Sequence, residues 1–217
     1  MQKIALIVAG GQGERMNTAI PKQFLLLKGT PILIHTLKQF SHFEEIVLVL
    51  PSMQFDYWHS LCDTYNFTLK HTLVAGGKTR FHSVKNGLEK VDDESIVAIH
   101  DGVRPLASTS LINRLISKAK DGMGIIPIVP VKDSIRKVDG ENSIHVDRKN
   151  LYNVQTPQCF ISSNIKKAYA QEFSEHFTDD ASVFEANIGK INTVLGEEKN
   201  LKITTEEDLK IASCLFS

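Results

Sequence analysis

The sequence predicts an α/β fold with a Rossmann-like, mostly parallel sheet, helices on both faces and a projecting β-arm. Three observations predict it: apolar runs alternate with amphipathic stretches, the first run is apolar throughout, and one polar segment breaks the alternation. Strands that alternate with helices form mostly parallel sheets covered on both faces. We expect residues 1–217 to form a single domain.

The predicted elements follow in order along the chain. Strand-like runs lie at 4–9, 45–50, 69–74, 95–100, 124–129 and 190–195, and helical stretches lie at 31–40, 53–65, 80–90, 108–120, 163–175 and 205–216. The first run, Ile4–Val8, is typical of a strand buried on both faces. Because ligands of such sheets bind beyond the carboxyl ends of the strands, the loops expected to matter are 10–23, 75–83, 100–106, 130–136 and 196–204.

Residues 135–155 break this alternation. A turn at 139–142 separates two short polar stretches, which indicates an antiparallel excursion. The segment has few residues that could join a core, so we expect an arm at about 135–155 that projects from the domain. An arm that cannot bury its own faces is expected to pack on a second copy of the chain, which predicts a homodimer.

The composition excludes several classes of protein. Lys plus Arg and Asp plus Glu both number 25, so the formal charge is zero, which argues against a general nucleic-acid or membrane-surface binder. No apolar run reaches the roughly 18 residues of a membrane span, and we expect the first residues to form a core strand and not a signal peptide. Its three cysteines are far apart and its histidines lack ligand spacing, so we expect a reduced, cytoplasmic protein without zinc.

The loop after the first strand predicts a polyphosphate site. Gly10, Gly11 and Gly13 leave the backbone exposed, so several N–H groups can converge on one oxyanion. Arg15 and Lys22 add two positive charges a short distance along the chain. A dinucleotide-binding fingerprint does not fit, because its third glycine would fall on a methionine, and a P-loop ending at 77–79 would need glycine at a threonine. The alternative is a structural tight turn.

The segment His100–Pro105 follows the buried run that ends at Ile99. Asp101, at the carboxyl end of that strand, is placed to bind a divalent metal or a ribose hydroxyl. The alternative is that Asp101 caps a turn and pairs with Arg104. We expect His100 to be a hydrogen-bonded core histidine and not a base.

Two further segments give weaker evidence of a functional role when each is taken alone. Residues 76–83 lie between a strand and a helix, where Ser83 could reach a base or sugar and Thr79 could cap the helix. In the cluster 178–182, Thr178 or Asp179 could cap the next helix.

Taken together, the motifs resemble the 2-C-methyl-D-erythritol 4-phosphate cytidylyltransferase family of the non-mevalonate route to isoprenoids. The resemblance runs in order from Ile4 to about Ala212. The first loop through Pro21-Lys22-Gln23 marks the wider nucleotidyltransferase group. The narrower match comes from 100–105, Asp147-Arg148, Thr156-Pro157-Gln158, 178–182 and 201–204.

The resemblance implies a site for CTP and methylerythritol phosphate, with Arg15, Lys22, Arg148 and Lys202 as the catalytic cations. The residues implied for cytosine and ribose are Ala9, Gly10, Gly11, Gly13, Gly77 and Ser83. Arg15 and Lys22 would grip the triphosphate, and Asp101 with Gly102 would bind ribose or organise Mg²⁺ or another divalent cation. The residues implied for methylerythritol phosphate are Arg104, Ser134, Arg148, Thr156 and Lys202, of which Ser134 and Arg148, on the dimerisation arm, would serve the partner's site.

Three positions depart from the family pattern. Lys78 stands where an acid usually lies beside the base, Gly102 where alanine is common, and Ser134 where threonine is common. The lysine puts that contact with the base in doubt, whereas the other two changes are expected to be harmless.

The implied reaction is in-line attack by a substrate phosphate oxygen on the α-phosphorus of CTP, with release of pyrophosphate. A phosphate monoester is already ionised near pH 7, so positioning and charge stabilisation suffice without a general base. The alternatives are a ribitol 5-phosphate cytidylyltransferase, whose loops look similar, and a non-catalytic nucleotide-sensing module. From the chain length we expect no fused cyclodiphosphate synthase domain.

Overall fold

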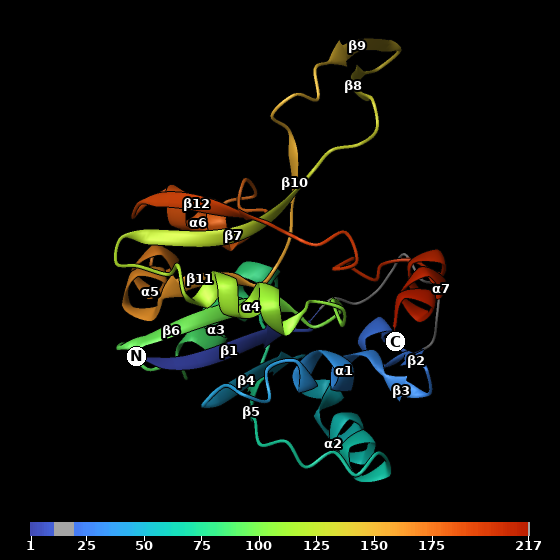
Figure 1. The fold of residues 1–217 in the computed structure, drawn as a ribbon. Helices are drawn as coiled ribbons and strands as arrows, with labels where there is room; N and C mark the ends of the chain where they lie inside the picture. The colour runs from blue at the N-terminus through green and yellow to red at the C-terminus, as the bar shows by residue number, and fades with distance from the viewer. Residues whose placement is uncertain (11–19, 217) are drawn as a thin grey trace.

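A computed structural model describes residues 1–10 and 20–216 of the chain (Figure 1). The strands are β1 (Gln2–Val8), β2 (Leu26–Leu27), β3 (Thr30–Pro31), β4 (Glu45–Leu50), β5 (Thr72–Ala75), β6 (Ser95–Asp101), β7 (Met123–Pro130), β8 (Ile135–Asp139), β9 (Asn142–Val146), β10 (Tyr152–Val154), β11 (Gln158–Ile161) and β12 (Lys190–Leu195). The helices are α1 (Ile32–Lys38), α2 (Phe55–Thr64), α3 (Arg80–Leu88), α4 (Thr109–Ile116), α5 (Ser162–Tyr169), α6 (Asp180–Glu185) and α7 (Glu206–Leu215), with 3₁₀ turns η2 (Lys22–Phe24) and η3 (Ser52–Gln54). No described helix is long and apolar enough to cross a membrane.

The central sheet is mostly parallel, as the sequence predicts. β1 pairs in parallel with β4 and β6, β4 with β5, and β7 with β12. β11 runs antiparallel between β6 and β7, and β10 continues along the same edge of β7. The sequence analysis did not find β11, because its four residues follow a proline and resemble no alternating or long apolar run.

Alternate residues of β1 belong to two separate cores. Ala5 and Ile7 face the core that includes residues of α1, α2 and α4, whereas Ile4, Leu6 and Val8 face the core formed with α3, α5 and α6. Side chains alternate between the two faces of a strand, so an entirely apolar strand must be covered on both sides. This confirms helices on both faces of the sheet.

Helix starts follow the capping residues that the sequence offers. Thr79 accepts a hydrogen bond from the backbone N of His82 and caps α3, as expected. Asp179 caps α6 and forms a capping box with Ser182. The helix predicted at 163–175 is shorter in the structure, where α5 ends at Tyr169. Beyond its end, the aromatic ring of Phe173 packs on that of Phe81, with 5.7 Å between ring centroids.

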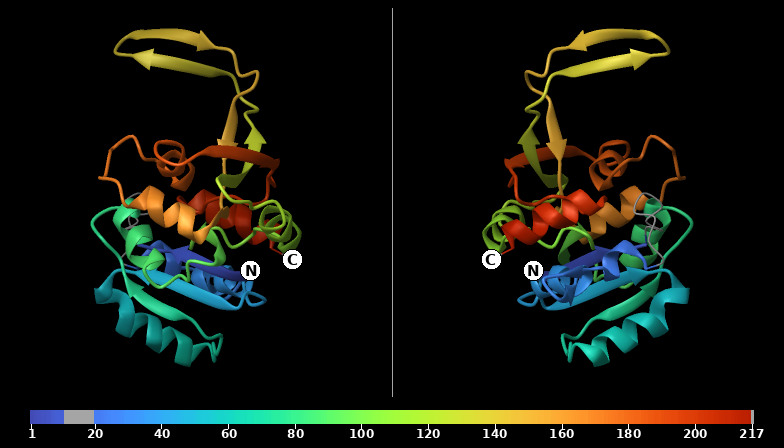
Figure 2. Two further views of the ribbon diagram at one scale, coloured as in Figure 1. Left: turned by 90° about the vertical axis from the view of Figure 1, so that its left-hand side faces the viewer. Right: turned by 90° about the vertical axis from the view of Figure 1, so that its right-hand side faces the viewer.

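The arm projects beyond the rest of the fold (Figures 1 and 2). β8 and β9 pair with each other in a separate two-stranded sheet, in register from Ile135–Val146 to Asp139–Asn142. Val138 and Ile144 are 66% and 63% exposed in the single chain. Residues 152–154, which the sequence analysis placed in the arm, return to the central sheet as β10.

Candidate active site at the carboxyl ends of the strands

A cavity of about 770 Å³ lies beyond the carboxyl ends of β1, β4, β5 and β6. Its described lining residues are Val8, Ala9, Gly10, Lys22, Gln23, Pro51, Ser52, Met53, Gly76, Gly77, Lys78, Thr79, Arg80, Ser83, Asp101, Val103, Lys202 and Thr204. This is the edge at which ligands of parallel sheets bind. The predicted loops 10–23, 75–83, 100–106 and 196–204 therefore contribute described residues to one cavity, and residues 51–53 add a segment that the sequence analysis did not find.

The charges around this cavity suit an anionic ligand. Lys22, Lys78, Arg80 and Lys202 are basic, and Asp101 is the one carboxylate among the described lining residues. Backbone N–H groups and cations together stabilise phosphate oxygens. A polyphosphate is therefore the ligand class that the described lining fits best.

Asp101, at the end of β6, is surrounded by three cations. Its Oδ2 lies 3.1 Å from Nε of Arg104 and 3.2 Å from Nζ of Lys202, and its Oδ1 lies 3.5 Å from Nε of Arg80. Burial alone would raise the pKa of Asp101, but the charges of Arg80, Lys202 and Arg104 outweigh it and hold that pKa well below its usual range. The carboxylate is therefore ionised, and the pairing of Arg104 with Asp101, which the sequence analysis gave as the alternative to a metal or ribose role, is present.

His100 is a core residue, as the sequence analysis expected. It is fully buried, its Nε2 lies 3.1 Å from the backbone O of Arg104, and its Nδ1 lies 2.9 Å from Oγ1 of Thr156. Thr156 in turn accepts a hydrogen bond from the backbone N of Asp101 at 3.0 Å. Burial lowers the pKa of His100 to about 4, so the ring is neutral near pH 7 and fixes the backbone around Asp101.

Between pH 7 and pH 5 the free energy of unfolding should fall by about 2 kcal/mol through His100 alone. Its pKa is about 4 in the folded chain against an ordinary 6.5, so the unfolded chain binds the proton more readily across that window. Urea titrations at several pH values should show this slope, and His100→Asn should lose it. Asp101 acts separately, below its ordinary pKa of 3.8. An NMR-measured pKa of His100 near 6.5 would contradict the expectation.

The loop that carries Lys202 is held by buried polar side chains. Gln155 donates from Nε2 to the backbone O of Glu197 at 2.8 Å, and Asn200 donates from Nδ2 to the backbone O of Thr156 at 2.9 Å. Arg104 donates from Nη1 to the backbone O of Asn200 at 2.9 Å. The loop thus places Nζ of Lys202 against Asp101 while its side chain stays 41% exposed.

The glycine-rich loop after β5 meets α3 closely. The backbone N of Gly77 donates to Oγ of Ser83 at 3.1 Å, and a Cβ on Gly77 would lie 2.4 Å from the Cβ of His82. Only glycine allows that approach without a shift of the loop. At Gly102, a Cβ would lie 2.7 Å from that of Ala9, so alanine at this position would require a local shift.

The structure brings together only part of the predicted site. Among its described members, those that line the cavity are Ala9, Gly10, Lys22, Gly77, Ser83, Asp101 and Lys202. Gly102, Arg104 and Thr156 lie directly behind or beside Asp101. Gly11, Gly13 and Arg15 lie outside the described residues.

Ser134 and Arg148 are exposed residues at the base of the arm and are not among the described residues that line the cavity. Arg148 donates a hydrogen bond to the backbone O of Lys132. Their assignment to a partner's site therefore stays a prediction.

Two residues of this region were missed as functional candidates. Gln23, 1% exposed, donates from Nε2 to the backbone O of Ala9 at 2.9 Å and to Oε1 of Gln54 at 2.8 Å, so it ties the end of β1 to η3. Arg80 contacts both Asp101 and Asp180, and Asp180 lies 100 positions after Arg80 in the sequence. Only the fold brings these partners together, and no local pattern in the sequence indicates them.

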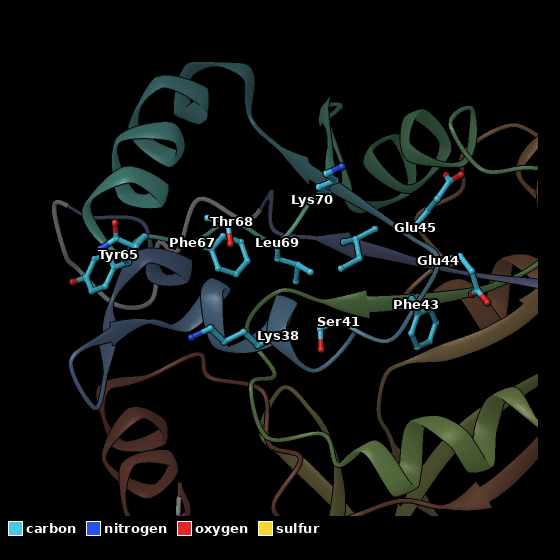
Figure 3. Close-up of a pocket in the computed structure, with 12 residues that line it drawn as sticks. Lys38, Ser41, Phe43, Glu44, Glu45, Tyr65, Phe67, Thr68, Leu69 and Lys70 are labelled. Carbon is cyan, nitrogen blue, oxygen red and sulfur yellow. The ribbon is translucent and has the colours of Figure 1, made fainter.

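A second cavity, of about 550 Å³, lies at the opposite end of the strands (Figure 3). Glu45, the first residue of β4, borders it together with Glu44, Lys38 and Lys70. Its charges are therefore of both signs, and Oε2 of Glu44 already accepts a hydrogen bond from the backbone N of Lys3 at 2.9 Å. The cavity at the carboxyl ends remains the candidate active site.

Comparisons with known proteins agree on one family. Residues 3–217 match the family model of 2-C-methyl-D-erythritol 4-phosphate cytidylyltransferase. The chain is 48% identical to the protein of that name from Azobacteroides pseudotrichonymphae, with 99% of both chains covered, and 47% identical to that of Bacteroides fragilis over the full length of both.

Solved structures give the same result. The crystal structure of 2-C-methyl-D-erythritol 4-phosphate cytidylyltransferase from Thermus thermophilus superposes with a TM-score of 0.82 at 30% identity, covering 99% of this chain and 98% of that one. The crystal structure of 4-diphosphocytidyl-2C-methyl-D-erythritol synthase from Anaerococcus prevotii gives 0.80 at 32% identity, covering 99% and 95%. The loops after its strands meet in one basic cavity, and its sequence matches the family over nearly its whole length. The chain belongs to the 2-C-methyl-D-erythritol 4-phosphate cytidylyltransferase family.

Proposed function

We propose that the cavity at the carboxyl ends transfers CMP from CTP to 2-C-methyl-D-erythritol 4-phosphate, giving 4-diphosphocytidyl-2-C-methyl-D-erythritol and pyrophosphate. The observation that carries the proposal is that four cations, Lys22, Lys78, Arg80 and Lys202, line one cavity together with Asp101 in a chain of this family. A phosphate oxygen of the sugar phosphate forms a bond to the α-phosphorus of CTP. The bond from the α-phosphorus to the bridging oxygen breaks, and pyrophosphate leaves with that electron pair.

The residues near the reaction act by charge and position. Negative charge grows on the oxygens around the α-phosphorus and on the leaving pyrophosphate, where Lys22 and, by resemblance, Arg15 stabilise it. The attacking phosphate is already ionised, so no residue has to remove a proton. His100 could not do so in any case, because its ring is buried and both nitrogens are occupied.

The nucleotide would lie across the ends of β1 and β5. Ala9, Gly10, Gly77 and Ser83 all border the cavity, and a Cβ on Gly10 would lie 3.5 Å from Oγ of Ser83. Exposed backbone N–H groups and the Ser83 hydroxyl can pair with the base and the ribose. Lys78 adds a positive charge where the family usually has an acid, so we propose that the base is read there through backbone groups.

A divalent cation would be held at this site mainly by the substrate. Among the described residues, no cluster of three or more His, Cys, Asp or Glu could hold a metal by itself, and Asp101, the one carboxylate among the described lining residues, already pairs with Arg80, Arg104 and Lys202. Mg²⁺ binds proteins through as few as one or two carboxylates and takes its other ligands from substrate phosphates and water. We propose that Asp101 helps to organise a Mg²⁺ ion held on the phosphates of CTP, where the ion would neutralise charge.

The arm is proposed to join two copies of the chain. β8 and β9 pair only with each other among the described strands, and Val138 and Ile144 are mostly exposed. An isolated two-stranded hairpin is at best marginally stable in water. A partner subunit that covers the hairpin would bring Ser134 and Arg148 to its site.

The function can be tested directly. The purified chain with CTP, Mg²⁺ and methylerythritol phosphate should release pyrophosphate and form the cytidylyl product, detected by phosphorus NMR. Ribitol 5-phosphate should be a much poorer substrate. Preference for ribitol 5-phosphate would replace the proposal with the related cytidylyltransferase, and CTP binding without turnover of either substrate would indicate a sensing module.

Lys202→Ala should raise the KM for methylerythritol phosphate by about 10- to 100-fold and leave CTP affinity nearly unchanged. Hydrogen bonds to charged groups contribute about 1.5–3 kcal/mol, and the side chain of Lys202 is exposed at the cavity while Asp101 holds its Nζ. Arg148→Ala should act the same way. Kinetics with the sugar phosphate and calorimetry with CTP measure the two quantities. A large loss of CTP binding with an unchanged KM for the sugar phosphate would reverse the assignment.

A further inference from the structure

Asp180 holds the guanidinium of Arg80 from outside the cavity. The carboxylate of Asp180 is fully buried at the start of α6, and Arg80 begins α3. Nη1 of Arg80 donates to Oδ1 of Asp180 at 2.8 Å, and Nη2 donates to Oδ2 at 2.7 Å. The hydroxyl of Tyr169 donates to Oδ1 at 2.6 Å. Arg80 thus has a two-bond pair at its far end, the geometry that fixes a guanidinium most firmly.

The remaining nitrogen of Arg80 faces the site. Nε lies 3.5 Å from Oδ1 of Asp101, whereas Oδ2 of Asp101 is shared by Arg104 and Lys202. Arg80 lines the cavity, but Asp180 and Tyr169 are not among its described lining residues. One guanidinium therefore bridges a carboxylate in the site and a carboxylate behind it.

We propose that Asp180, supported by Tyr169, is a positioning residue for cytidylyl transfer and acts through Arg80. The inference rests on the proposed function. Asp180 takes up the two terminal nitrogens of Arg80, so that only Nε meets Asp101. Oδ2 of Asp101 is then left to Lys202, whose side chain reaches the cavity, and to Arg104 behind it.

Loss of the Asp180 charge would release this arrangement. The end of Arg80 would be free to form its own two-bond pair with Asp101 and to compete with Lys202 for the carboxylate, or to contact the nucleotide phosphates directly. Either movement displaces charged groups that the transition state needs in place. Small displacements of this kind cost about 100-fold in rate.

A purely structural role predicts a different result. If Asp180 only supported the fold, Asp180→Asn would lower the free energy of unfolding but keep kcat/KM per folded site. The positioning role predicts a low kcat/KM per folded site.

The test compares Asp180→Asn with the matched control Asp179→Asn. Asp179 caps α6, and its side chain bonds to Gln158 and to the backbone of Ser182, not to Arg80. Rates are divided by the CTP-binding stoichiometry from calorimetry, so that misfolded protein does not count. Asp180→Asn should lower kcat/KM by about 10- to 100-fold, Tyr169→Phe should lower it less, and Asp179→Asn should keep it.

A double-mutant cycle assigns the effect to Arg80. In an Arg80→Met background, adding Asp180→Asn should lower kcat/KM no further, since the group through which Asp180 acts is gone. Additive losses would overturn the inference. Equal kcat/KM values for Asp180→Asn and Asp179→Asn would also overturn the inference, provided that the wild-type chain is active. An inactive wild-type chain would overturn the proposed function itself and this inference with it.

Discussion

Lys22→Ala is expected to lower kcat by about two to three orders of magnitude, with a much smaller loss of CTP affinity. Lys22 follows Pro21 at the start of η2 and borders the cavity at the end of β1. Its fixed charge matters most when charge builds around the α-phosphorus, so it stabilises the transition state more than bound CTP. Arg15, which lies outside the described residues, is expected to behave in the same way. Single-turnover kinetics and CTP calorimetry separate the two effects.

Lys78→Ala provides the matched control for this experiment. Lys78 also borders the cavity, so its loss changes the net charge of the site by the same amount. If only the general positive field mattered, Lys78→Ala and Lys22→Ala would lower kcat equally. A near-normal kcat in both Lys22→Ala and Arg15→Ala would contradict the assigned roles.

The sheet and its helices were largely predictable because the signal is local. An apolar run such as Ile4–Val8 specifies a strand covered on both sides, and capping residues such as Thr79 mark where helices begin. The insertion of β11 between β6 and β7 was not predictable. Four residues carry too short a pattern, and their place depends on pairing with strands about 60 and 34 positions away.

The candidate site was also only partly predictable from the sequence. Asp101, Lys22 and Gly77 follow strand-like runs, so their positions at the carboxyl edge could be inferred. The bridge from Asp101 through Arg80 to Asp180 could not, because it joins three helix and strand ends that are far apart in the sequence. The sequence analysis assigned no role to Arg80, and it placed Asp180 only within the cluster 178–182.

The second large expected effect is a recovery of activity when two variants are mixed, and it concerns the arm. If Arg148 serves the partner's site, Arg148→Ala and Arg15→Ala chains should each have low activity alone, at a methylerythritol phosphate concentration well below the raised KM of Arg148→Ala, and should recover activity when mixed. In the heterodimer, one site collects both defects, and the other has wild-type residues at both positions. Random exchange gives about half heterodimers, so about a quarter of all sites should be intact.

This recovery depends on the arm reaching across the interface. The single chain supports that geometry, since the β8–β9 hairpin stands away from the domain (Figure 2). The side chains of Val138 and Ile144 on this hairpin are mostly exposed. Subunit exchange is followed with differently labelled chains, and the rate of pyrophosphate release is compared with that of the wild type at equal concentration. A matched mixture of two Arg148→Ala preparations should show no recovery. Exchange without recovery would mean that the arm serves its own subunit, and a monomer in sedimentation would remove the shared site altogether.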